Sequence, residues 1–170
     1  MSVAGKTKLG RNAKGLFEPT MKISYTVDIN STPEGVWYWI GTPERAAVWQ
    51  TSVSKNEIVH ETPDMIGTTF RETVEENGRG VEMHGVVTSY RENELLALHL
   101  DSKYHSVDVE YRLEEIENRT HLTQNATVRF KSFMKVVSIL IGPVLKKKIM
   151  NQSQKEFAAL KELCERSAPS

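Results

Sequence analysis

The sequence predicts an α+β fold in which an antiparallel sheet of about six or seven strands is covered on one face by a long C-terminal helix. Between 53 and 132, apolar and polar residues alternate in segments joined by short turns, which is typical of antiparallel strands. From 143 to 166, apolar residues recur every three or four positions, which is typical of an amphipathic helix. An apolar sheet face must be covered, and this helix is the element that can cover it.

Length and charge limit the classes of function. The chain has 170 residues, a usual length for one domain. Lys plus Arg and Asp plus Glu number 22 each, so no net field favours nucleic acid, and we expect no nucleic-acid partner. The single cysteine, Cys164, excludes an intramolecular disulfide and fits a reducing compartment. We therefore expect a cytoplasmic location.

The two ends of the chain set the domain boundaries. Residues 1–20 are basic, with no acid before Glu18, but they lack the apolar stretch of a secretion signal. We expect them to be a disordered tail, followed by a single domain at 21–168. The longest nearly apolar run, Val136 to Leu145, is far shorter than the roughly 20 residues that cross a bilayer. We therefore expect a soluble protein.

The domain is expected to begin with a strand and two short helices. Ser31 or Thr32 can cap a first helix that starts near Pro33, and a second Thr-Pro-Glu sequence starts another helix after Gly41. The preceding strand is indicated by apolar residues that alternate with polar ones: Ile23, Tyr25, Val27 and Ile29.

Turns then predict how the remaining strands pair. Asn77-Gly78 favours a two-residue type I′ turn, because both of its central residues need positive φ, and this turn pairs Val74 with Val81. Further turns are expected near 92–93, at 103–106 and at 118–119. They predict three more pairs: Val87 with Leu98, Leu98 with Tyr111, and Tyr111 with Ala126.

These registers give the sheet one apolar and one polar face, and a one-residue slip would reverse the faces. The polar face places Arg71 beside His84, His99 beside Glu110, and Asp108 beside Arg129. The apolar face carries Phe70, Val74, Val81, Met83, Val87, Leu96, Leu98, Leu100, Val107, Val109, Tyr111, Leu113, Ala126, Val128 and Phe130.

The final helix presents one apolar stripe. Pro143 is suited to a helix start, and Gly142 is expected to end a shorter helix or loop that runs from about Phe133. The stripe that should cover the sheet consists of Leu145, Ile149, Ser153, Phe157, Leu160 and Cys164.

This order of elements, together with local motifs, resembles a known superfamily. STPEGVWYWIGTPERAAVW at 31–49, GTTFRETV and GVVTSYRENELLAL are similar to the polyketide cyclase/dehydrase-like branch of the START and birch-pollen-allergen superfamily (SRPBCC). The resemblance covers about residues 21 to 166. It implies a helix-grip fold, in which a curved sheet wraps around the last helix and leaves a pocket. Members include lipid carriers, cyclases and hydrolases, so it specifies the fold more closely than the function.

Polar residues on the inner face are the candidates for chemistry. A carboxyl group in an apolar pocket has a raised pKa, so Glu72 is a candidate acid or base, with Tyr111 as proton donor or orienting partner. Alternatively, Glu72 lies in water at the pocket mouth or pairs with a cation. The candidate ligand-binding residues are Tyr25, Trp49, Phe70, Met83, Val87, Ser89, Leu98, Leu100, Val109, Gln124, Ile149, Ser153 and Phe157.

We expect neither a metal nor a cofactor, because the five histidines lack ligand spacing and no phosphate-binding loop is present. The favoured hypothesis is binding of a small hydrophobic molecule, such as a lipid, isoprenoid or polyketide, with the segment 133–142 as a lid. The alternative is a cyclase, dehydratase or hydrolase that uses Glu72. A third hypothesis is docking to a membrane or protein through Lys146–Lys148, although membrane contact is not predicted.

Overall fold

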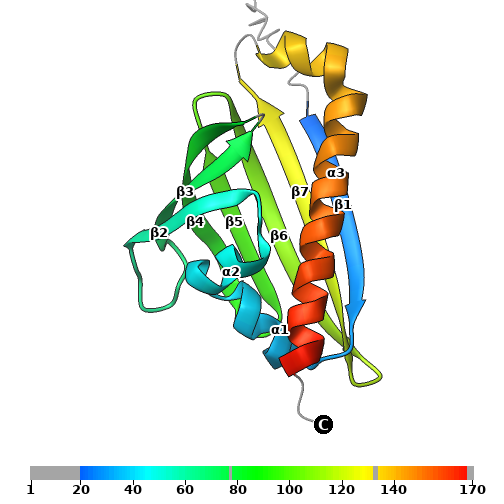
Figure 1. Cartoon of the computed structure of the whole chain (residues 1–170). Helices are drawn as coiled ribbons and strands as arrows, with labels where there is room; N and C mark the ends of the chain where they lie inside the picture. The colour runs from blue at the N-terminus through cyan, green and yellow to red at the C-terminus, as the bar shows by residue number, and fades with distance from the viewer. Residues whose placement is uncertain (1–19, 77, 132–133, 168–170) are drawn as a thin grey trace, which may run out of the picture.

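The computed structural model describes residues 20–76, 78–131 and 134–167. The side chains at 76, 134–141 and 167 are not described, and the predicted tail lies outside the described residues except for Thr20. Seven antiparallel strands form one curved sheet in the order β1-β7-β6-β5-β4-β3-β2 (Figure 1). The strands are β1 (Thr20–Ile29), β2 (Val53–His60), β3 (Thr69–Glu76), β4 (Arg79–Arg91), β5 (Leu95–Asp101), β6 (His105–Ile116) and β7 (Arg119–Phe130).

Three helices accompany the sheet. After β1 come α1 (Pro33–Ile40) and α2 (Pro43–Trp49), and the chain ends in α3 (Met134–Ser167). The Thr32 side chain caps α1 by accepting a hydrogen bond from the Gly35 backbone N–H, as its Ser-Thr-Pro sequence predicts. Figure 1 shows α3 running along the concave side of the sheet beside β1 and β7. This arrangement confirms the predicted helix-grip fold.

The first two predicted hairpins have the expected pairs. Val74 lies opposite Val81, and Val87 lies opposite Leu98. Gly78, with φ of +75°, adopts the left-handed backbone that the β3–β4 turn needs. The turn's other central residue, Asn77, lies outside the described residues.

The two later registers were wrong by two residues. Leu98 pairs with Val109 rather than Tyr111, and Tyr111 pairs with Gln124 rather than Ala126. In the second case the turn lies at Glu117 and Asn118, which both have positive φ, and so begins one residue before the predicted position. A shift of two residues leaves every side chain on its predicted face, because side chains alternate with period two.

The same shift changes the neighbours on the outer face. His99 pairs with Asp108 rather than Glu110, and its Nδ1 lies 2.6 Å from an Asp108 carboxylate oxygen. Asp108 also forms an ion pair with Arg129, its diagonal neighbour on β7. His84 and Arg71 are paired as predicted.

Because β4 contains a bulge, the prediction that Ser89 faces inward was wrong. The pairing with β5 shifts between Val87 and Ser89, so that Tyr90, and not Ser89, lies opposite Leu96. Tyr90 packs against the core, with its ring 5.4 Å from that of Trp37. No turn residue in the sequence marks this bulge.

The prediction that a helix starts at Pro143 was also wrong. α3 is continuous from Met134, with Pro143 inside it, and Figure 1 shows the early turns of the helix lying at an angle to the rest. The predicted lid therefore has a helical backbone from 134 onward. Its side chains up to 141 lie outside what the structure describes.

Candidate functional site

A large cavity lies between the sheet and α3. The helix packs mainly against β1, with smaller contacts to α1, α2 and β7, so α3 leaves most of the inner face of β2 to β5 uncovered. The space that remains has a volume of about 1730 Å³ and is open to solvent. Ile149 and Ser153 of α3 face it, as the helical stripe predicts.

The wall of the cavity is mostly apolar. Phe70, Met83 and Leu100 form one buried cluster on adjacent strands of the wall. Of the residues that the sequence indicated as candidates, those that line the cavity are Trp49, Phe70, Glu72, Met83, Val87, Leu98, Leu100, Val109, Tyr111, Gln124, Ile149 and Ser153. The structure thus brings most of the candidates around one space.

Three predicted ligand-binding residues lie elsewhere. Tyr25 and Phe157 pack ring against ring, with centroids 5.1 Å apart, in the core beyond the end of the cavity. Phe157 is fully buried there. Ser89 is removed from the cavity wall by the β4 bulge.

Gly85 marks a close approach on the cavity wall. It lies opposite Phe70, and a Cβ added at Gly85 would come within 2.1 Å of the Phe70 ring. The tip of the Phe70 ring, its Cζ, Cε1 and Cε2 atoms, therefore takes the position that a side chain would occupy. The absence of a side chain at Gly85 lets Phe70 form part of the wall.

Glu72 is the ionisable group inside the apolar wall. β3 directs it inward between Asn56 of β2 and Met83 of β4, its partners across the two neighbouring strands. Burial raises the pKa of Glu72 to about 7 from the usual 4.5. Near neutral pH, this carboxyl group is therefore divided between its neutral and charged forms.

Tyr111 of β6 also lines the cavity. Its hydroxyl oxygen accepts hydrogen bonds from Gln50 Nε2 at 3.2 Å and from Gln124 Nε2 at 3.0 Å. Burial raises the pKa of Tyr111, and the nearby charge of Glu72 acts in the same direction. The phenol therefore stays protonated, and its own O–H remains available to a ligand.

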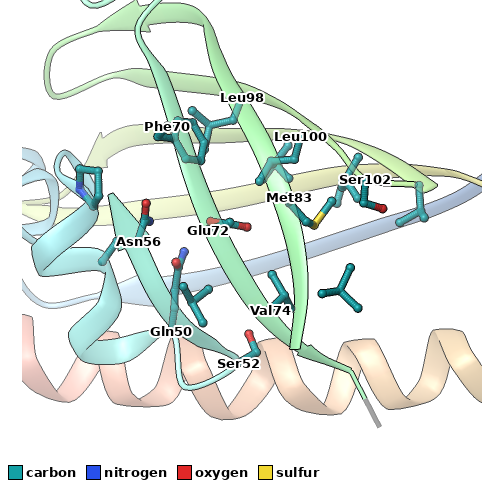
Figure 2. A pocket seen from close by; sticks show the side chains of 18 of the residues that line it. Gln50, Ser52, Asn56, Phe70, Glu72, Val74, Met83, Leu98, Leu100 and Ser102 are labelled. Carbon is teal, nitrogen blue, oxygen red and sulfur yellow. The ribbon is translucent and has the colours of Figure 1, made fainter. Parts of the chain in front are cut away.

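Sequence reasoning missed Asn56 and Gln50. The Asn56 Oδ1 atom is buried and has no hydrogen-bond partner in the described part of the chain. Figure 2 shows Asn56, Glu72 and Gln50 in the same region of the pocket. The inward position of Asn56 was open to prediction once β2 was paired with β3, whereas Gln50 lies in the connection after α2, which has no periodicity to read. We call Gln50, Asn56, Glu72, Tyr111 and Gln124 the polar cluster.

Glu156, also missed, ties α3 to the segment after α2. Its Oε1 accepts hydrogen bonds from the Ser52 backbone N–H at 2.8 Å and from Gln152 Nε2 at 2.9 Å. The stripe itself carried a signal, since Glu156 lies three residues after Ser153 on the cavity side. These contacts join the helix to the edge of the cavity near β2.

Basic side chains occur on the cavity lining and on α3. Lys131 forms an ion pair with Asp101 at 2.5 Å. Lys146 and Lys147 are exposed, while Lys148 also lines the cavity.

No described helix is long and apolar enough to cross a membrane. In the described chain, no three His, Cys, Asp or Glu side chains converge as metal ligands do.

Comparison with solved structures supports the fold. The Zhui aromatase/cyclase from Streptomyces sp. R1128 has a TM-score of 0.73 at 15% identity, over 87% of this chain and 95% of that chain. A START superfamily protein from Mycobacterium smegmatis has a TM-score of 0.71 at 18% identity, over 85% and 97%. The protein TTHA0849 from Thermus thermophilus has a TM-score of 0.72 at 12% identity, over 88% and 100%. At these identities, the likeness shows a shared fold.

Comparison of the sequence with known families gives a more specific result than comparison of the structures does. The search among curated proteins found no significant match. A family model described as polyketide cyclase / dehydrase and lipid transport matches residues 20–165, from the first residue of β1 almost to the end of α3. The matched range contains the cavity and every residue of the polar cluster. The chain therefore belongs to the polyketide cyclase/dehydrase and lipid transport family.

Proposed function

We propose that this protein binds a small, mainly apolar molecule in the cavity between the sheet and α3. The observation that carries the proposal is a space of about 1730 Å³ with apolar walls and a small group of buried polar atoms on one side. Pockets for drug-sized ligands are commonly about 300 to 1000 Å³, so a lipid, isoprenoid or polyketide would fit. Membership of a family named for polyketide chemistry and lipid transport supports the same class of ligand.

The apolar wall and the polar cluster would contribute differently to binding. Each Å² of apolar surface removed from water contributes about 25 cal/mol, so the wall would supply most of the affinity. The polar cluster would orient the ligand, because a polar atom buried without a partner costs about 1 to 3 kcal/mol and is satisfied when a ligand group reaches it.

A neutral fluorescent probe, N-phenyl-1-naphthylamine, tests binding in the cavity. The wild-type protein should enhance its fluorescence saturably, and Leu98→Glu should abolish uptake by placing a charge on the wall. Val86→Glu is the matched control, because Val86 lies on the same sheet but faces the opposite side. Equal uptake by folded wild type and Leu98→Glu would refute the assigned site.

Acid–base catalysis in the same cavity is the second candidate. It is favoured by one observation: the cavity is lined both by the carboxyl group of Glu72, with a pKa of about 7, and by the protonated hydroxyl of Tyr111. If Glu72 acts as a base, hydrolysis of p-nitrophenyl decanoate should rise with pH through about 7. Glu72→Gln should remove that rise while probe binding persists. An unchanged pH profile in this variant would reject the role.

A further inference from the structure

Two members of the polar cluster, Glu72 and Asn56, present acceptor atoms to the cavity without a hydrogen-bond donor from the described residues. Glu72 has no hydrogen bond or ion pair with any other described residue, and Asn56 Oδ1 is likewise unpartnered. They are direct cross-strand neighbours, so their acceptor atoms lie on one patch of the wall. Figure 2 shows the Asn56 and Glu72 side chains near each other among the residues that line the pocket.

Neutral or acidic side chains line the cavity on four elements near this patch. β4 contributes Met83, β6 contributes Tyr111, β7 contributes Gln124, and α3 contributes Glu156. The other titratable side chains on the cavity lining are Glu75, Arg79, Glu82, His84, Asp101, Lys103, Tyr104, His105, Lys131 and Lys148. Burial raises the pKa of Glu72, and Lys131, one of these cations, pairs with Asp101 instead.

We infer that the cavity selects an amphipathic cation, an apolar body with a protonated amine that donates hydrogen bonds to the Glu72 carboxylate and to Asn56 Oδ1. The inference deepens the proposed function and rests on it. An ammonium group has three donors and a positive charge, so it can satisfy both acceptors at once. An alcohol has one donor, and a ligand carboxylate would be repelled by Glu72.

Binding of such a cation is linked to the protonation of Glu72. The carboxyl group must be ionised to pair with an ammonium, and its pKa in the free protein is about 7. Affinity for an amine should therefore be highest above pH 7 and fall about tenfold per pH unit below it. A neutral ligand should not share this loss, and an anionic ligand should show the opposite trend.

Three probes with the same chain, dodecylamine, 1-dodecanol and dodecanoic acid, test the inference by isothermal titration at micromolar concentration. At pH 8 the amine should bind at least about tenfold more tightly than the alcohol, which should bind more tightly than the acid. At pH 5.5 the advantage of the amine over the alcohol should fall by about tenfold or more.

Variants of polar-cluster residues test whether these residues cause the tighter binding of the amine. Glu72→Gln should remove the advantage of the amine and leave the affinity for the alcohol within about threefold. Glu57→Gln is the control on the neighbouring strand β2, and it should keep the advantage because Glu57 lies opposite Arg71 on the outer face of the sheet. Asn56→Leu should weaken binding of the amine while the protein stays folded.

The outcomes separate this inference from the proposed function. If dodecanoic acid binds most tightly, or if Glu72→Gln keeps the full amine advantage, the amphipathic cation is wrong while a binding cavity stands. If none of the three probes binds and N-phenyl-1-naphthylamine is also excluded, the proposed function and the inference both fail.

Discussion

The two ends of the space between the sheet and α3 have the same architecture but differ in packing. One end is filled by side chains, and the other is an open cavity. At the closed end, near α1 and α2, the side chains of Phe157, Leu160 and Cys164 are at most 1% exposed and belong to one buried cluster with Trp49. At the open end, Ile149 and the residues near it on α3 face a cavity. Both ends use one helical stripe and one apolar sheet face. What separates them is the presence of α1, α2 and large aromatic rings, which fill the closed end.

Removing a closed-end ring should have the largest effect on stability. Phe157→Ala should lower the free energy of unfolding by about 3 to 5 kcal/mol, because it leaves a void among Tyr25, Trp49 and Tyr111. Val74→Ala, on the cavity wall, should cost below about 1 kcal/mol, because it enlarges a space that already exists. Urea unfolding measures both, and equal losses would mean that the two ends are packed alike.

Ionisation of Glu72, at the open end, should make the free energy of unfolding depend on pH. Its folded pKa of about 7 lies above the usual 4.5, so the folded state binds this proton more tightly than the unfolded state. The stability that this proton provides is complete below pH 4.5 and is lost as pH rises through 7. From pH 4.5 to 8, wild type should therefore lose about 3 kcal/mol relative to Glu72→Gln. Parallel stability curves for the two proteins would contradict this.

Thiol labelling compares access to the two ends directly. Burial raises the pKa of Cys164 to about 12, so the native thiol should be unreactive toward methyl methanethiosulfonate. A cysteine placed by Ser153→Cys, in a Cys164→Ala background, faces the cavity and should react at least about a hundredfold faster. Similar rates for the two thiols would show that the cavity is closed.

Glu156→Gln should have the smallest effect. The change weakens the charge-assisted hydrogen bond from the Ser52 backbone N–H and should cost about 1 kcal/mol. Ser54→Ala, which removes an exposed side-chain hydrogen bond to the Thr73 carbonyl on the same β2 edge, is the control and should cost less. Thermal unfolding distinguishes the two, and a greater loss in the control would place the main support of this edge elsewhere.

The fold could be predicted from periodicity because the side-chain period of a strand tolerates errors of two residues. The pairing of Tyr111 with Ala126 was wrong, yet every residue on the predicted apolar face kept its side. A bulge shifts the pairing by one residue and has no such tolerance. Ser89 was therefore placed inward when Tyr90 holds that position.

The site was predictable where polar residues interrupt an apolar face and unpredictable where the backbone is irregular. Glu72, Tyr111 and Gln124 were found because each breaks the apolar pattern of its strand. Gln50 comes from a loop, and the continuous helix through Pro143 depends on tertiary packing that a proline rule does not describe. The alternation also could not tell Phe157, in the packed core, from Ile149, on the cavity wall.

The central claim is that the open end of this space holds an apolar ligand. The most direct test is the mass of the protein, purified without a hydrophobic tag, first under native and then under denaturing conditions. We expect a non-covalent adduct that is released on unfolding, or, for empty protein, saturable uptake of added N-phenyl-1-naphthylamine. A protein that carries no adduct and takes up no apolar probe while folded would contradict the account.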